Sequence, residues 1–112
     1  MSTPYAEAAI QSKAVDSLVA RIVEIAHPLK IVLFGSAARN ELHAESDIDV
    51  LVVMPDGTRR RQVAQMLYRQ IRGLGVPFDI LVATPMDLRK HQNNPGLIYR
   101  DLLKEGREVY AA

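Results

Sequence analysis

The sequence predicts an α/β protein built around a small core of three strands, and three observations support this fold class. Three short apolar segments, at residues 31–34, 47–54 and 76–83, have the length and residue types of buried strands. Two longer segments, at residues 4–26 and 58–75, repeat apolar residues every three or four positions, as amphipathic helices do. Residues typical of turns separate these segments. Such an alternation is typical of a sheet covered by helices.

The first predicted helix covers residues 4–26, with Thr3 as its N-cap and Pro4 at the first helical position. The pair His27-Pro28 should end this helix, because the residue before a proline avoids helical backbone angles. Residues 31–34 follow as a strand, since the apolar run is too short for a helix.

The second predicted strand, residues 47–54, ends in a turn at residues 55–57. Thr58 is expected to cap a second helix, which Gly73 and Gly75 should terminate.

The third predicted strand covers residues 76–83. A helix joins it to the second strand, so a right-handed crossover should make the two strands parallel neighbours. The sequence of residues 84–87, Thr-Pro-Met-Asp, predicts a further helix with Asp87 in a capping box. A last helix is expected from Asn94-Pro95 to Gly106.

Length and composition limit the classes of protein. With 112 residues, the sequence predicts a single domain over residues 1–112. The absence of cysteine excludes disulfides and cysteine-ligated zinc. The net charge of +1 gives no reason to expect direct nucleic-acid binding. We also expect no membrane segment and a cytoplasmic location, because the apolar runs are short and no signal segment begins the chain.

Three aspartates interrupt the most apolar part of the sequence. Asp47 and Asp49 stand at the start of the second strand, where residues two apart point to the same face. Asp79 stands near the start of the third strand, so parallel pairing would bring the three carboxylates together. Such a cluster does not stay ionised in a partly desolvated place without a cation. Carboxylate oxygens suit Mg²⁺ or Mn²⁺, which take further ligands from substrate phosphates.

A Gly35-Ser36 pair follows the first strand and predicts a tight turn with free backbone N–H groups and a hydroxyl. This arrangement is typical of phosphate binding. Arg39, beside the turn, either contacts a phosphate or pairs with Glu41 or Glu45, and the residues do not decide between these alternatives. Metal-binding carboxylates facing a phosphate site indicate phosphoryl or nucleotidyl transfer.

These motifs resemble a known family. Gly35-Ser36, a gap of ten residues and then Asp47-Ile48-Asp49 resemble the nucleotidyltransferases of the DNA polymerase β superfamily. The closest likeness is to the minimal nucleotidyltransferase (MNT) proteins, and the ending at residues 94–110 is similar to the tail usual in this family. The resemblance implies the nucleotidyltransferase fold, a small mixed sheet of three to four strands flanked by helices.

The resemblance also implies a role for each site residue. Asp47 and Asp49 would bind Mg²⁺ or Mn²⁺, and Gly35 with Ser36 would hold the triphosphate of the nucleotide. Asp79 would complete the carboxylate triad as a third metal ligand and act as the base toward the incoming hydroxyl. The implied activity is transfer of a nucleoside monophosphate, AMP from ATP, to a hydroxyl acceptor.

The family further implies a protein partner. In HEPN/MNT toxin–antitoxin pairs the acceptor is a tyrosine of a helical HEPN toxin, and the MNT protein acts as antitoxin. Two alternatives remain open: a catalytically silent antitoxin or complex subunit that acts by binding alone, and a small nucleotide-binding regulator. Homo-oligomerisation is also left open. One departure is Asn40, where family members usually carry glycine, although asparagine tolerates left-handed backbone angles.

The same residues also have plainer interpretations. The aspartates at 47 and 49 would then face solvent beside a polar hairpin loop, and Asp79 would lie at an exposed strand end. Residues 59–61 are three arginines that mark either an anionic partner or a solvated helix face.

Overall fold

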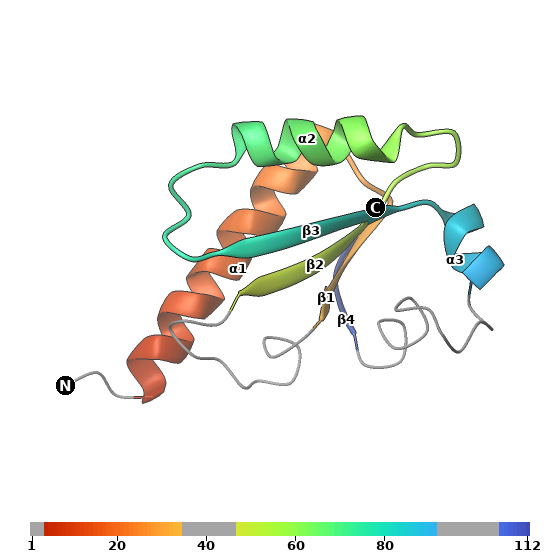
Figure 1. The fold of residues 1–112 in the computed structure, drawn as a ribbon. Coiled ribbons are helices and arrows are strands. Elements are labelled where there is room, and N and C mark those ends of the chain that lie inside the picture. The colour runs from red at the N-terminus through yellow and green to blue at the C-terminus, as the bar shows by residue number, and fades with distance from the viewer. Residues whose placement is uncertain (1–3, 35–46, 92–105) are drawn as a thin grey trace.

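The computed structural model describes residues 4–34, 47–91 and 106–112, and it confirms the predicted α/β class (Figure 1). Helices and strands alternate along most of the chain, as the sequence pattern indicated. The elements in order are α1 (Pro4–Ala26), β1 (Lys30–Phe34), β2 (Ile48–Val53), α2 (Arg60–Gln70), β3 (Phe78–Ala83), α3 (Pro85–His91) and β4 (Arg107–Ala111).

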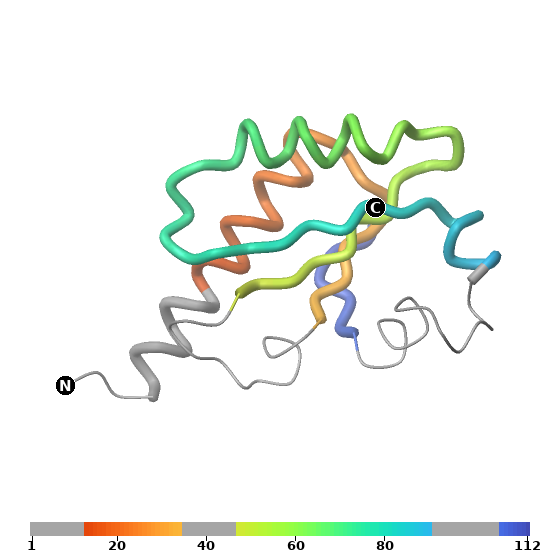
Figure 2. Tube along the Cα trace, in the orientation of Figure 1, coloured from red at the N-terminus to blue at the C-terminus, as the bar shows by residue number. Residues whose placement is uncertain are grey.

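The four strands form one mixed sheet in the order β3-β2-β1-β4. β2 and β3 are parallel, as the crossover through α2 predicted, and β1 is antiparallel to both of its neighbours. β2 and β3 begin at the same end of the sheet, which Figure 2 shows along the Cα trace. Within the described residues the sheet has four strands, which confirms the expectation of three to four.

Helices α1 and α2 cover one face of this sheet (Figure 1). Alternate residues of β2 and β3 point into this layer, where they meet apolar side chains of both helices. The buried members of this core are Ala14, Val15, Leu18, Ile22, Ile31, Leu33, Ile48, Val50, Val52, Met54, Leu67, Ile71, Ile80 and Val82.

The opposite face of the sheet has a second, smaller cluster. Its buried members are Val32, Leu51, Val53 and Ala83, and Leu88 of α3 packs against them. Odd-numbered residues of β2 and β3 therefore point away from α1 and α2. This alternation decides the face on which the aspartates of both strands lie.

The end of α1 agrees with the sequence prediction. His27 adopts a left-handed conformation with φ of 50°, and its N–H donates to the carbonyl of Val23 at 3.0 Å. A residue in this conformation is a common helix terminator, and Pro28 prevents continuation. The predicted N-cap, Thr3, lies outside the described residues.

The predicted cap of α2 is wrong. The Oγ1 of Thr58 donates to the carbonyl of Pro55 at 2.6 Å and so closes the preceding turn, while Arg59 occupies the N-cap position without a side-chain hydrogen bond. The helix also ends at Gln70, before the two glycines, because Ile71 leaves helical angles. Gly73 and Gly75 instead have φ of 73° and 86° in the loop that leads to β3.

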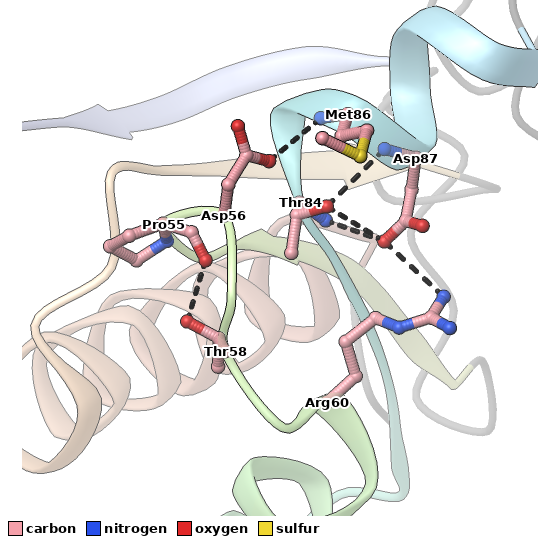
Figure 3. Close-up of polar contacts among 7 residues, drawn as sticks. All are labelled: Pro55, Asp56, Thr58, Arg60, Thr84, Met86 and Asp87. Atoms are coloured by element: carbon pink, nitrogen blue, oxygen red, sulfur yellow. Dashed lines mark hydrogen bonds and ion pairs between the residues drawn. The ribbon is translucent and has the colours of Figure 1, made fainter.

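Helix α3 begins with the predicted capping box (Figure 3). The backbone N–H of Thr84 donates to Oδ2 of Asp87 at 3.0 Å, and the N–H of Asp87 donates to Oγ1 of Thr84 at 3.2 Å. Arg60 forms an ion pair with Asp87 at 3.3 Å, so one of the three arginines at residues 59–61 has a structural partner. Asp56 accepts the N–H of Met86 at 2.9 Å. These contacts hold α3 beside the turn that precedes α2.

Strand boundaries differ slightly from those expected. β2 begins and ends one residue inside residues 47–54, and β3 begins two residues after residue 76. β4 was not among the elements expected from the pattern, and the helix expected from Asn94 lies largely outside the described residues. Among the helices of the described ranges, none is long and apolar enough to cross a membrane.

Candidate active site

The parallel pairing of β2 with β3 places Asp49 directly opposite Asp79. Register partners on neighbouring strands lie about 4.8 Å apart, and in a parallel pair they point to the same face. Asp47 precedes β2 by one residue and stands two positions before Asp49. The structure thus brings the three predicted carboxylates to one end of the sheet, on the face opposite α1 and α2.

The electrostatics of this cluster agree with that geometry. Burial raises the pKa of Asp49 above its ordinary value, and the negative charges of Asp79 and then Asp47 raise it further. Asp49 is half-buried, whereas Asp47 and Asp79 are exposed. Asp79 and Asp47 therefore both lie close enough to repel Asp49, which is the least exposed of the three carboxylates.

Apolar packing fixes where these carboxylates point. Ile48, Val50 and Ile80 alternate with the aspartates and are buried in the core against α1 and α2. A slip of one residue in either strand would bury a carboxylate in this core and expose an isoleucine. The alternation of apolar residues therefore holds Asp49 and Asp79 on the opposite face.

β1, the other neighbour of β2, ends beside the aspartates and continues into the predicted phosphate-binding turn. Phe34, the last residue of β1, pairs with Asp49 across the antiparallel ladder. Gly35 follows Phe34 directly in the sequence. Gly35, Ser36 and Arg39 themselves lie outside the described residues, as does Asn40, so their predicted roles stay predictions.

The donor set suits a divalent ion. Within the described ranges, no three His, Asp or Glu side chains are arranged closely enough to hold a metal ion by themselves. Mg²⁺ does not require such a cage, since it keeps several waters and is usually held by one or two carboxylates plus substrate phosphates. Asp47 and Asp49 fit that pattern, and a cation would relieve the repulsion that raises the pKa of Asp49.

One contact beside the site had no signal in the sequence. The hydroxyl oxygen of Tyr68 in α2 accepts the backbone N–H of Ile80 at 2.7 Å. The ring of Tyr68 stacks on Phe78, with centroids 5.7 Å apart. Tyr68 is 44% exposed and lies outside the apolar stripe of α2, so helical periodicity alone assigns it to solvent.

The fold and the candidate site together indicate the class of protein to which this chain belongs. A small mixed sheet with paired aspartates at the start of one strand and a third on its parallel neighbour is an arrangement suited to metal-dependent phosphoryl or nucleotidyl transfer. The family model of the nucleotidyltransferase domain matches residues 13–109. The chain therefore belongs to the nucleotidyltransferase domain family, as its motifs predicted.

Two solved structures share the fold. One is a candidate nucleotidyltransferase from Sulfolobus solfataricus, with a TM-score of 0.60 and 22% sequence identity, covering 99% of this chain and 90% of that chain. The other is a toxin–antitoxin crystallised with AMP-PNP, with a TM-score of 0.54 and 22% identity, covering 87% of this chain and 73% of that chain. At this identity the likeness establishes the fold alone. Among curated proteins, none matches the sequence significantly.

Proposed function

We propose that residues 1–112 form one minimal nucleotidyltransferase domain that transfers a nucleoside monophosphate to a hydroxyl acceptor. The observation that carries this proposal is the register of β2 and β3, which pairs Asp49 with Asp79 and places Asp47 two residues before. A repulsive cluster of this kind lowers stability unless it binds a cation. The match to the nucleotidyltransferase domain over residues 13–109 supports the same reaction class.

The proposed reaction gives each described carboxylate a role. The acceptor hydroxyl loses its proton to Asp79, and its oxygen forms a bond to the α-phosphorus of the nucleotide. The bond from the α-phosphorus to the oxygen that bridges to the β-phosphate breaks, and pyrophosphate leaves. Asp47 and Asp49, with Asp79 as the third ligand, would hold Mg²⁺ or Mn²⁺, which when bound neutralises charge on the phosphates.

The triphosphate site of the proposal is the turn after β1. Gly35 and Ser36 would donate backbone N–H groups and a hydroxyl to phosphate oxygens, with Arg39 as a further cation. The pairing of Phe34 with Asp49 supports this assignment, because the chain leaves β1 next to the carboxylates. Asn40 would replace the glycine usual in this turn.

We further propose ATP as the nucleotide and a tyrosine of a HEPN-type helical toxin as the acceptor, so that the protein acts as an antitoxin. The support is the shared fold with a toxin–antitoxin that was crystallised with AMP-PNP.

Labelled ATP tests the reaction. The protein, purified with its native partners, is incubated in Mg²⁺ with ATP carrying label on either the α- or the γ-phosphate. We expect the α-label on the partner, together with a mass gain of one or more AMP units. Asp49→Asn should abolish this transfer, whereas Asp16→Asn, an exposed substitution on α1, should leave it unchanged. Transfer of the γ-label instead would assign a kinase reaction.

The same preparation separates catalysis from binding alone. An enzyme present in catalytic amounts leaves a partner that stays modified and inactive after separation. A binding protein must cover the partner at one-to-one ratio, so its effect would disappear on dilution. An unmodified partner that the double variant Asp47→Asn, Asp49→Asn still neutralises at one-to-one ratio would support the silent antitoxin.

A further inference from the structure

We propose that Tyr68 of α2 is a positioning residue, which holds Asp79 at the distance from Asp49 that the active site needs. This inference rests on the proposed function, because it concerns the same carboxylates. It adds a residue outside the motif, on a helix that carries none of the predicted site residues.

The first step is to establish which residues of β3 direct their backbone N–H and C=O groups toward β2. The carbonyls of Pro77 and Ala83 accept the backbone N–H groups of Ile48 and Met54 at 3.0 and 2.8 Å. Both carbonyls come from odd-numbered residues beside or within β3, so these residues direct their backbone groups toward β2. The N–H of Ile80, at an even position, therefore points away from β2.

The second step concerns the outer side of β3. β3 ends the order of the described strands, so none of them pairs with this side of β3. The hydroxyl oxygen of Tyr68 accepts the outward N–H of Ile80 at 2.7 Å. Its ring lies nearly parallel to that of Phe78, with an interplanar angle of 10°. One side chain of α2 thus contacts both chain neighbours of Asp79.

The third step is the force that these contacts oppose. Asp79 lies opposite Asp49 in the register of β2 and β3, and two carboxylates at this spacing repel each other. An edge strand has ladder hydrogen bonds on one side only, and residues 73 and 75 in the loop before it are glycines with positive φ. Tyr68 contacts β3 on the side that faces away from β2, at the two residues that flank Asp79. A misplacement of about 1 Å in a catalytic group can cost on the order of 100-fold in rate.

Removal of one oxygen atom tests this proposal. Tyr68→Phe keeps the ring on Phe78 and removes only the bond to Ile80, and Tyr110→Phe of β4, at the far edge of the sheet, is the matched control. The measured quantity is Mn²⁺ affinity in the presence of ATP. We expect Tyr68→Phe to weaken Mn²⁺ binding about threefold to tenfold, the range that corresponds to one hydrogen bond, and Tyr110→Phe to leave it unchanged.

A double-mutant cycle separates positioning from general destabilisation. If Tyr68 acts through Asp79, Tyr68→Phe should have no further effect on Mn²⁺ affinity in an Asp79→Asn background. Phe78→Leu gives an independent variant, which removes the stack and keeps the hydroxyl bond, and it too should weaken Mn²⁺ binding.

The outcomes distinguish this inference from the proposed function. Equal Mn²⁺ affinity of wild type and Tyr68→Phe, or an undiminished effect of Tyr68→Phe in the Asp79→Asn background, would overturn the role of Tyr68 and leave the proposed function intact. A wild-type protein whose Mn²⁺ affinity is no greater than that of Asp49→Asn would overturn the proposed function and the role of Tyr68 with it.

Discussion

Replacing Asp49 with asparagine should make the metal-free protein more stable while it abolishes the proposed activity. The folded state raises the pKa of Asp49, through burial and through the charges of Asp79 and Asp47. A raised pKa means that ionisation of this carboxyl opposes folding. The amide side chain has a similar shape without the charge, so Asp49→Asn removes the penalty.

The size of the gain follows from the strand spacing. Two unit charges about 5 Å apart repel by about 0.8 kcal/mol in bulk water and by about 3 kcal/mol at an effective dielectric constant of about 20. Asp79 is exposed, so solvent screening places its repulsion near the lower limit, at about 1 kcal/mol. For a domain of this size, 1 kcal/mol raises the melting temperature by about 4 °C.

Thermal unfolding in EDTA measures this gain as a function of pH. The penalty is present where Asp49 is ionised and disappears as the pH falls through its raised pKa. The gain of Asp49→Asn over wild type should therefore be largest at neutral pH and shrink in acid. Asp79→Asn should give a smaller gain, because it relieves repulsion without removing a half-buried charge. Asp16→Asn on the exposed side of α1 is the control.

Two results would refute this reasoning. A loss of stability in Asp49→Asn at neutral pH would mean that the carboxylate is favourably partnered in the folded state. A gain that is as large in acid as at neutral pH would mean that the effect does not come from ionisation.

Three further predictions concern the metal, the nucleotide and the cap of α3. Adding Mg²⁺ to the wild type should raise its melting temperature at neutral pH and leave that of Asp49→Asn nearly unchanged, which differential scanning fluorimetry checks; equal shifts would place the metal elsewhere. Ser36→Ala should weaken ATP binding only moderately, because backbone N–H groups would remain in the turn, and a complete loss in equilibrium titration would contradict that. Thr84→Ala should cost about 1 kcal/mol of unfolding free energy through loss of the cap on α3, measured by urea denaturation, whereas Thr58→Ala, which caps no helix, should cost less.

The sequence predicted the convergence of the three aspartates through two general rules. Alternation within a strand placed Asp47 and Asp49 on one face, and the right-handed crossover through a helix made β2 and β3 parallel neighbours. The register that sets Asp49 opposite Asp79 required the structure. Apolar alternation excludes a slip of one residue but not of two, so the sequence pattern alone does not fix this register.

The wrong predictions have local physical causes. Ile71 continues the apolar stripe of α2 and is buried, but it packs against the core from outside the helix. Thr58 has a carbonyl within reach in its own turn, and this local bond replaces the expected cap. β4 carries charged residues at Arg107 and Glu108 and is largely exposed, so its pairing with β1 leaves little apolar periodicity to detect.

The contacts of Tyr68 could not be predicted from a sequence pattern, because they depend on the path of the chain between α2 and β3. These contacts join residues 10 and 12 positions away, across a loop whose path sets whether the hydroxyl reaches β3. Periodicity describes which face of a helix is apolar, and it does not describe which backbone group an exposed tyrosine meets.

Calorimetric titration of the wild-type protein with ATP, in excess Mg²⁺ and again in EDTA, tests the central claim most directly. The carboxylates repel a triphosphate unless cations intervene, so ATP should bind in Mg²⁺ and lose most of its affinity in EDTA. The double variant Asp47→Asn, Asp49→Asn should show little difference between the two conditions. Equal ATP affinity of the wild type in Mg²⁺ and in EDTA would contradict a metal-dependent nucleotide site at Asp47, Asp49 and Asp79.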